Sequence, residues 1–247
     1  MQRKFFFLPV LLLGMACAPS PVLRLNPLSG ETKWIYGKEF ARCETDEVEI
    51  AVAFDSMDEA AIIFDVEVTN LAGQPVLISP ERFYYLSLVW PQDTVSLAAA
   101  PRRASYAIDP EIKILDIDKE ISRENASYAT YTSIDAVGGL LDLVGIFANI
   151  GKKKTEQEIK EEEQRRRDNE IARQNQEISY ENIMARLKSE KAKWESTTLR
   201  RTTLDPEQSV RGTVHFPAND QAKYLKLCFP IGETNLQIVF MQKKVKA

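Results

Sequence analysis

The chain is poor in the residues on which most enzymes and metal sites depend. Its 247 residues include one histidine, three cysteines and ten glycines. A single histidine excludes sites built from several imidazoles and most histidine-based proton relays. Three cysteines are too few for a disulfide scaffold. The sequence also has no G-x-S-x-G elbow, no paired Cys-x-x-Cys and no His/Glu metal spacing. We therefore expect no enzyme, no cofactor and no metal.

The chain also lacks an excess of positive charge. Its formal charge is −4, so there is no bulk electrostatic attraction to nucleic acid, and we expect no nucleic-acid partner. The 44% of hydrophobic residues is too high for a wholly disordered protein. A chain of 247 residues is long enough for one or two packed domains.

The N-terminus has the order of charges and apolar residues that is typical of an export signal. Arg3 and Lys4 are followed by a short apolar run over 5–13, by small residues at 14 and 16, and then by Cys17. The run is too short to span a bilayer, which needs about 20 apolar residues. The stretch resembles the lipobox of bacterial lipoproteins, with Met15 between Leu13 and the small residue before the cysteine.

This resemblance implies that residues 1–16 are a signal peptide and that Cys17 is acylated, with palmitate among the expected fatty acids. The protein would then be exported and anchored to the cell envelope by its lipid, in the outer membrane and facing the periplasm. The alternatives are an ordinary signal peptide or an uncleaved anchor. Residues 17–31 contain several prolines, so we predict an extended, lipid-anchored tether there.

Two regions, 32–108 and 197–247, alternate between apolar and polar residues as half-buried strands do. In 62–69 the even positions are apolar and the odd positions mostly polar, and 210–216 shows the same period of two. The prediction is a mainly β fold with an α insertion: an antiparallel β-sandwich in two parts. The pattern loosely resembles the Ig-like domains of uncharacterised bacterial lipoproteins, a resemblance that carries no functional residues across.

The intervening region, 109–196, has a helical period and is predicted to be an insertion into the sandwich. Asp109-Pro110 is a helix start, with a capping side chain followed by proline in the first turn. The later part, 152–195, contains 12 Lys/Arg and 11 Asp/Glu, with four favourable i,i+4 pairs such as Glu162–Arg166. We expect a solvent-exposed helix that is stabilised by ion pairs between its own side chains. The apolar segment 136–150 is expected to cover one face or one end of the sandwich.

One stripe of the charged helix is apolar. Its residues are expected to pack back onto the protein as the root of an arm that contacts a partner, and they are Tyr180, Ile183, Met184, Leu187 and Trp194.

Three further sets of residues are candidates for special roles. Cys43 and Cys228 would meet an oxidising periplasm, where they could form a disulfide or stay free thiols, and both alternatives are open. His215 lies at a polar position of a predicted strand, so we expect it at the surface. The aromatic residues of 83–90 offer a platform for glycan stacking, although a strand that is apolar on both faces favours a core role for Tyr84, Tyr85 and Trp90.

These observations favour a lipid-anchored envelope protein that acts by binding rather than by catalysis, as a scaffold in contact with another envelope protein. Its membrane contact would be the N-terminal lipid, and no small-molecule ligand is identified. A glycan-binding sandwich is the alternative. An unrecognised hydrolase comes third, because carboxylates are plentiful but no pair of them stands out.

Overall fold

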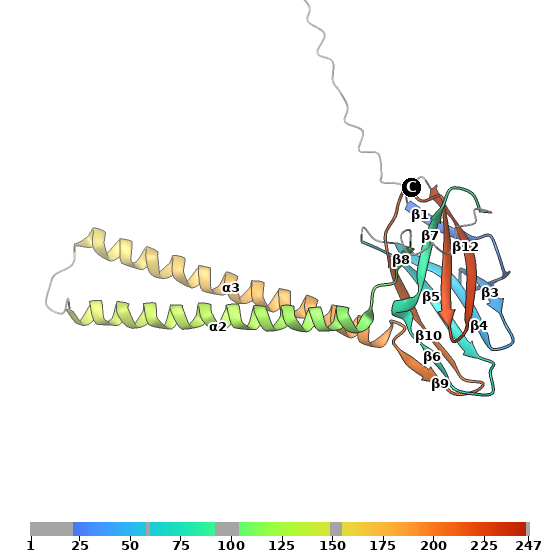
Figure 1. The fold of residues 1–247 in the computed structure, drawn as a ribbon. Helices are drawn as coiled ribbons and strands as arrows, with labels where there is room; N and C mark the ends of the chain where they lie inside the picture. The colour runs from blue at the N-terminus through green and yellow to red at the C-terminus, as the bar shows by residue number, and fades with distance from the viewer. Residues whose placement is uncertain (1–21, 58–59, 92–103, 149–154, 246–247) are drawn as a thin grey trace, which may run out of the picture.

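The computed structural model describes a sandwich of strands from which two long helices project (Figure 1). The described residues are 22–57, 60–91, 104–148 and 155–245, and within the first long helix the side chains of 135–139 and 141–148 are not described. The expected acylation site Cys17, the leader 1–16 and most side chains of the apolar segment 136–150 therefore lie outside the described residues.

Sheet 1 has five antiparallel strands in the order β1-β12-β11-β7-β8. The strands are β1 (Val22–Pro27), β7 (Tyr84–Leu88), β8 (Ala104–Tyr106), β11 (Tyr224–Ile231) and β12 (Thr234–Val245). The prediction of a tether over 17–31 is wrong for β1, which pairs with β12 along its whole length. β1 lies at the edge of the sheet, where a proline such as Pro27 costs no ladder hydrogen bond.

Sheet 2 has five antiparallel strands in the order β10-β5-β4-β3-β2. The strands are β2 (Glu31–Ile35), β3 (Lys38–Glu44), β4 (Val48–Met57), β5 (Ala61–Asn70) and β10 (Ser209–Pro217). A separate antiparallel pair is formed by β6 (Val76–Ile78) and β9 (Thr202–Leu204), and the short helix η1 (Pro80–Arg82) follows β6. The prediction of a mainly β, antiparallel sandwich with a helical insertion is confirmed.

The core lies between the two sheets and is built from the alternating positions of their strands. On β5 the even positions Ile62, Phe64, Val66 and Val68 are fully buried, as the period of two predicted. Phe64 contacts Phe216 of β10 and Phe240 of β12 edge-on, with ring centroids 5.9 and 5.1 Å apart. Both sheets therefore share one apolar core, which positions the surface features described below.

The insertion forms a helical hairpin, called the arm below. Its helices are α2 (Pro110–Ala148, 39 residues) and α3 (Glu156–Ser196, 41 residues). At a rise of 1.5 Å per residue each is about 60 Å long. The helices lie side by side at the sandwich and separate toward the far end (Figure 1). The backbone of 136–148 forms the far end of α2, so the expectation that this segment covers the sandwich is wrong. None of the described helices is long and apolar enough to cross a membrane.

Candidate interaction arm

Each helix of the arm begins at a cap made by its own side chains. Asp109 accepts a hydrogen bond from the backbone N–H of Glu111 at 2.9 Å, so α2 begins at the predicted Asp109-Pro110 pair. α3 begins with a capping box: the hydroxyl of Thr155 accepts from the backbone N–H of Glu158, and the Glu158 carboxylate accepts from the backbone N–H of Thr155. These local signals fix where the helices start without help from the sandwich.

The root of the arm is an apolar cluster between α2 and α3. Ile117, Leu187 and Trp194 are buried there, and four half-buried isoleucines pack around them. The indole of Trp194 also lies on the ring of His215 in β10, with centroids 4.4 Å apart. The predicted stripe thus packs back onto the protein, and its members Leu187 and Trp194 make contacts within the chain instead of offering a surface to a partner.

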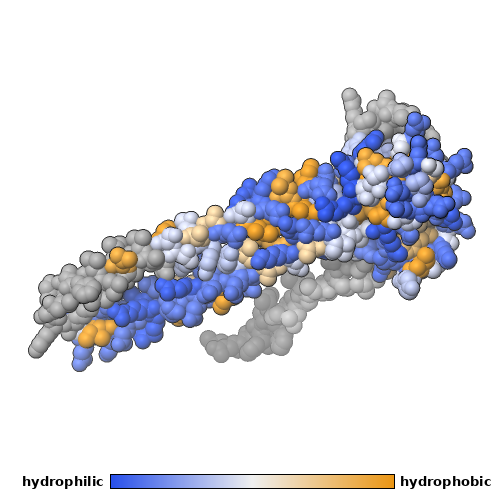
Figure 2. Space-filling model, turned by 90° about the horizontal axis from the view of Figure 1, so that it is seen from below, coloured by the Kyte–Doolittle hydropathy of each residue, from blue (hydrophilic) through white to orange (hydrophobic). Residues whose placement is uncertain are grey.

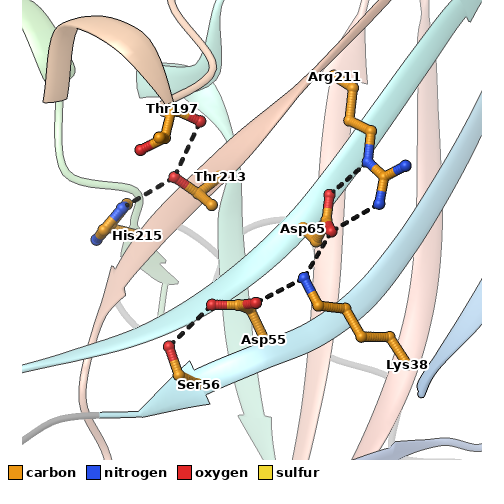
Figure 3. A network of polar contacts seen from close by, with 8 residues as sticks. All are labelled: Lys38, Asp55, Ser56, Asp65, Thr197, Arg211, Thr213 and His215. Atoms are coloured by element: carbon orange, nitrogen blue, oxygen red, sulfur yellow. Dashed lines mark hydrogen bonds and ion pairs between the residues drawn. The ribbon is translucent and has the colours of Figure 1, made fainter. Parts of the chain in front are cut away.

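Hydrogen bonds tie the end of α3 to β10. Thr213 donates from its backbone N–H and from its hydroxyl to the carbonyl of Thr197, and Leu199 donates to the carbonyl of Thr213. The close approach needs Gly212, because a Cβ atom there would lie 2.6 Å from the backbone nitrogen of Leu199. The expectation that His215 is a surface residue is wrong: it is buried, because Trp194 covers it and Thr213 contacts its ring nitrogen (Figure 3).

Ion pairs reinforce the root on its outer side. The Arg200 guanidinium donates two hydrogen bonds to the Glu111 carboxylate, at 2.7 and 2.6 Å, and so joins the two ends of the arm. The hydrogen bond from Arg200 holds the pKa of Glu111 below its ordinary value. Lys191 of α3 reaches Asp118 of α2 at 2.6 Å.

The middle of the arm is marked by a pair of stacked tyrosines. The rings of Tyr128 and Tyr180 are nearly parallel, with centroids 4.1 Å apart, and the hydroxyl of Tyr180 donates to Asn125. Tyr180, the first residue of the predicted stripe, therefore also contacts α2. Ile183 packs half-buried in the root, and Met184 is buried on the same side of α3.

Beyond the tyrosines α3 is exposed on all sides. Every residue from 155 to 179 is exposed except Glu162, which is half-buried. Ion pairs form along the helix itself, among them Arg166–Glu162 at 2.9 Å and Arg167–Glu163 at 3.8 Å, which are two of the four predicted i,i+4 pairs. Figure 2 shows apolar patches along the arm, separated by hydrophilic surface. We call residues 155–179 the distal segment of α3.

A second polar feature, which sequence reasoning missed, crosses the outer face of sheet 2 (Figure 3). Asp65 on β5 is buried and receives two hydrogen bonds of 2.8 Å from the guanidinium of Arg211 on β10 and one of 2.8 Å from Lys38 on β3. Lys38 also contacts Asp55 on β4 at 2.6 Å, and Arg211 lies over the ring of Phe40. The network therefore joins four of the five strands.

The electrostatics of Asp65 follow from this geometry. Burial raises its pKa, but hydrogen bonds from Arg211 and Lys38 outweigh burial, so the pKa lies below the ordinary value of 3.8. For Lys38, burial lowers the pKa and the bonds to Asp55 and Asp65 more than offset it. The lowered pKa favours the charged carboxylate of Asp65, which pairs with cations on β3 and β10. The alternation of polar residues placed these side chains on one face, but it carried no information on how they pair across strands.

The same face of sheet 2 holds a shallow cavity of about 350 Å³ near the edge strand β2. Three glutamates line it, Glu31, Glu49 and Glu67, together with Arg42, which is bound to Glu49 at 2.6 Å. The aromatic residues considered for glycan binding do not line this cavity. Tyr85 belongs to the core and Tyr84 is half-buried beside Tyr106, whereas Trp90, which was expected in the core, is 61% exposed beyond the end of β7.

Of the two alternatives for Cys43 and Cys228, the structure has the free thiols and no disulfide between them. Both cysteines are free: Cys43 packs against the core between the sheets, and Cys228 belongs to a cluster on the outer face of sheet 1. Cys43, on β3 of sheet 2, thus faces the core, whereas Cys228, on β11 of sheet 1, faces away from it. Burial raises the pKa of the Cys228 thiol, which favours its protonated, unreactive form.

Comparison of the chain with known protein families, with curated proteins and with solved structures gives no match. Among the residues that the structure describes, no group of three or more His, Cys, Asp or Glu side chains could hold a metal ion.

Proposed function

We propose that the protein is a lipid-anchored component of the bacterial cell envelope that acts without catalysis, as a scaffold whose arm binds another envelope protein. The anchor is Cys17, and the outer membrane facing the periplasm is the location. The folded part is a sandwich of Ig-like type. Two facing antiparallel sheets support this assignment, because the chain crosses from one to the other between β1 and β2, between β5 and β7 and between β10 and β11.

The observation that carries the proposal is the exposed distal segment of α3. Its 25 residues, 155–179, cover no part of the sandwich and are not enclosed by α2. Most of the stability of a helix in a protein comes from tertiary packing, which this segment lacks, and i,i+4 pairs add only about 0.2–0.5 kcal/mol each. A helix that is maintained in this way, at the end of an arm about 60 Å long, is suited to contact a molecule that lies away from the sandwich.

Two isoleucines give this segment a binding face. Ile171 and Ile178 are 55% and 56% exposed and lie seven residues apart, so they share one side of α3. Tyr180, Ile183 and Leu187 point to α2, and the helical period of 100° per residue places the two isoleucines roughly opposite them. An apolar pair that faces outward in a highly charged surface fits the groove of a helical partner, with the flanking charges setting its orientation.

The test is cross-linking in intact cells with a photoreactive amino acid at position 174, on the distal segment. The full chain is compared with the double variant Ile171→Ser/Ile178→Ser and with the control Asn169→Ser/Gln176→Ser, which changes exposed polar residues of the same helix. We expect one envelope protein to be cross-linked in the original chain and in the control. The serine double variant should reduce this product at least about tenfold, as removal of two central apolar contacts does.

Equal cross-linking by all three chains, or none by any, would overturn the binding role of the arm. The anchor is tested separately, by incorporation of a fatty-acid analogue. Cys17→Ser should abolish labelling, and unchanged labelling would remove the lipid from the proposal.

A further inference from the structure

The strands of the two sheets differ sharply in charge. The five strands of sheet 1 contain no Asp or Glu, and their four cations are Arg24, Lys226, Lys243 and Lys244. The five strands of sheet 2 contain seven Asp or Glu and four Lys or Arg. Sheet 2 can therefore pair its cations within the sheet, whereas sheet 1 offers its cations no acid on a neighbouring strand.

Three of the sheet 1 cations gather where β1 begins and β12 ends. Arg24 lies directly opposite Lys243, and Lys244 is the next residue of β12. All three side chains are exposed. Like charges that face each other across two strands destabilise the pair, so this arrangement costs free energy unless an anion lies against it.

Exposed apolar side chains lie at the same end of sheet 1. β7 runs to this end, since Leu88 pairs with Tyr224 and Tyr224 pairs with Met241 of β12. The two residues that follow β7 are Val89, 69% exposed, and Trp90, 61% exposed. Aliphatic and aromatic surface is thus placed beside the cations.

Lys223 connects the two groups. Its ammonium lies 5.8 Å from the ring centroid of Trp90, and its carbonyl accepts a hydrogen bond from the backbone N–H of Gln242, which precedes Lys243. Asp220 is the one acid in the loop 218–223 between β10 and β11. We call the surface formed by Arg24, Val89, Trp90, Lys223, Lys243 and Lys244 the basic rim.

We propose that the basic rim docks on the surface of a bilayer that carries anionic headgroups. Tryptophan is enriched at the interface between headgroups and acyl chains, and each Lys or Arg near an anionic surface is attracted to it. The rim thus combines the two kinds of side chain that such a surface binds.

The position at which β1 begins supports a bilayer, instead of another anionic molecule, as the ligand of the rim. β1 begins at the rim, so the chain that precedes Val22 joins the sandwich at this end. The inference rests on the proposed function in one respect: a lipid on Cys17 would be five residues from Val22, at most about 18 Å of extended chain. Such an anchor keeps the rim beside the bilayer.

Docking at the rim would orient the arm. The arm leaves the side of the sandwich, whereas β1 lies at the top in Figure 1. With the rim on the membrane, the arm extends alongside the bilayer instead of pointing away from it. The partner of the distal segment would then also be held close to the membrane.

The test measures how near Trp90 is to lipid in the full chain. The chain, with Cys17→Ser throughout so that acylation plays no part, is reconstituted into vesicles of phosphatidylcholine with phosphatidylglycerol and with brominated acyl chains that quench tryptophan on contact. Trp90→Phe is compared with the matched control Trp34→Phe, because Trp34 on β2 is 66% exposed and lies on the other sheet. We expect Trp90→Phe to remove at least about twice as much lipid-quenchable fluorescence as Trp34→Phe.

Charge reversal provides the second measurement. Lys243→Glu/Lys244→Glu should lower the quenching in vesicles with phosphatidylglycerol, whereas Lys160→Glu/Lys188→Glu, the same charge change at exposed positions of α3, should not. Circular dichroism checks that each variant is folded. Equal losses from Trp90→Phe and Trp34→Phe, or equal effects of the two reversals, would overturn the proposal. Neither result depends on acylation or on the partner of the arm, so failure here is distinct from failure of the proposed function.

Discussion

The two sheets of the sandwich share one core but use charge in opposite ways. In sheet 2, Asp65 lies between Arg211 and Lys38, and its charge joins strands that are distant in the chain. In sheet 1, Arg24 faces Lys243 with no acid on any strand of that sheet. The difference shows that charges on one sandwich can have opposite effects: the ion pairs of sheet 2 join its strands, whereas Arg24 and Lys243 of sheet 1 face each other with like charge.

The largest expected effect tests whether the two sheets form one cooperative unit. Phe64→Ala removes a fully buried ring that contacts both Phe216 of sheet 2 and Phe240 of sheet 1. We expect a loss of about 4 kcal/mol in the free energy of unfolding, within the usual range for a buried aromatic residue. Denaturant unfolding followed by circular dichroism measures it. Two separate transitions for the two sheets would contradict the shared core.

The next effect concerns the attachment of the arm to sheet 2. Trp194→Ala removes the indole that fills the root and covers His215, and we expect a cost of about 3 kcal/mol at this site. Hydrogen exchange should show faster exchange in 110–125 and 183–196, with β11 and β12 of sheet 1 unchanged. Uniform acceleration throughout both sheets would show that the root is not a separate structural unit.

The ion network of sheet 2 gives a smaller effect. Asp65→Asn keeps the shape of the side chain but leaves Arg211 and Lys38 without their shared carboxylate. We expect a loss of about 2 kcal/mol in the free energy of unfolding, measured by denaturant titration. Glu67→Gln, on the same strand and face, is the control and should change it by less than about 0.5 kcal/mol.

The same network predicts how stability depends on pH. The pKa of Asp65 is lower in the folded than in the unfolded chain, so its contribution is fully present above its ordinary pKa of 3.8 and is lost as the pH falls through the folded pKa. Unfolding measured from pH 5 down to pH 2 should therefore show a falling stability. The slope should be smaller in Asp65→Asn, and equal slopes would contradict the role of Asp65.

The smallest effect is expected in sheet 1, with the opposite sign. Arg24→Gln removes a charge that faces Lys243 and should stabilise the protein by about 0.3 kcal/mol at low salt. Added salt should stabilise the original chain by a similar amount and leave the variant unaffected. A loss of stability on this substitution would show that the two cations are not in repulsion.

Local chemistry predicted the helices and many of the strands. Asp109-Pro110 begins α2, and the even positions from Ile62 to Val68 are buried, because capping and the period of two depend only on neighbouring residues. The tether was mispredicted over β1, since the prolines that argued for an extended segment lie at or beyond the ends of an edge strand, where they are tolerated.

Features that depend on distant residues could not be read from the sequence. Asp65 and Arg211 are 146 residues apart, and nothing local to either predicts their pairing. Trp194 and His215 meet because the arm returns the chain to β10, which turned an expected surface histidine into a buried one. The apolar stripe of α3 predicted the root of the arm, but the outward position of Ile171 and Ile178 depends on which side of α3 contacts α2, and the sequence of α3 does not contain that information.

The ion pair between Glu111 and Arg200 has a consequence for how such a molecule can change over evolution. Because the chain enters and leaves the arm at one place, insertions or deletions of matched whole turns in α2 and α3 would alter the reach of the arm and leave the sandwich intact. The length of the arm and the structure of the sandwich are then independently adjustable: matched changes in the two helices lengthen or shorten the arm while the fold is kept.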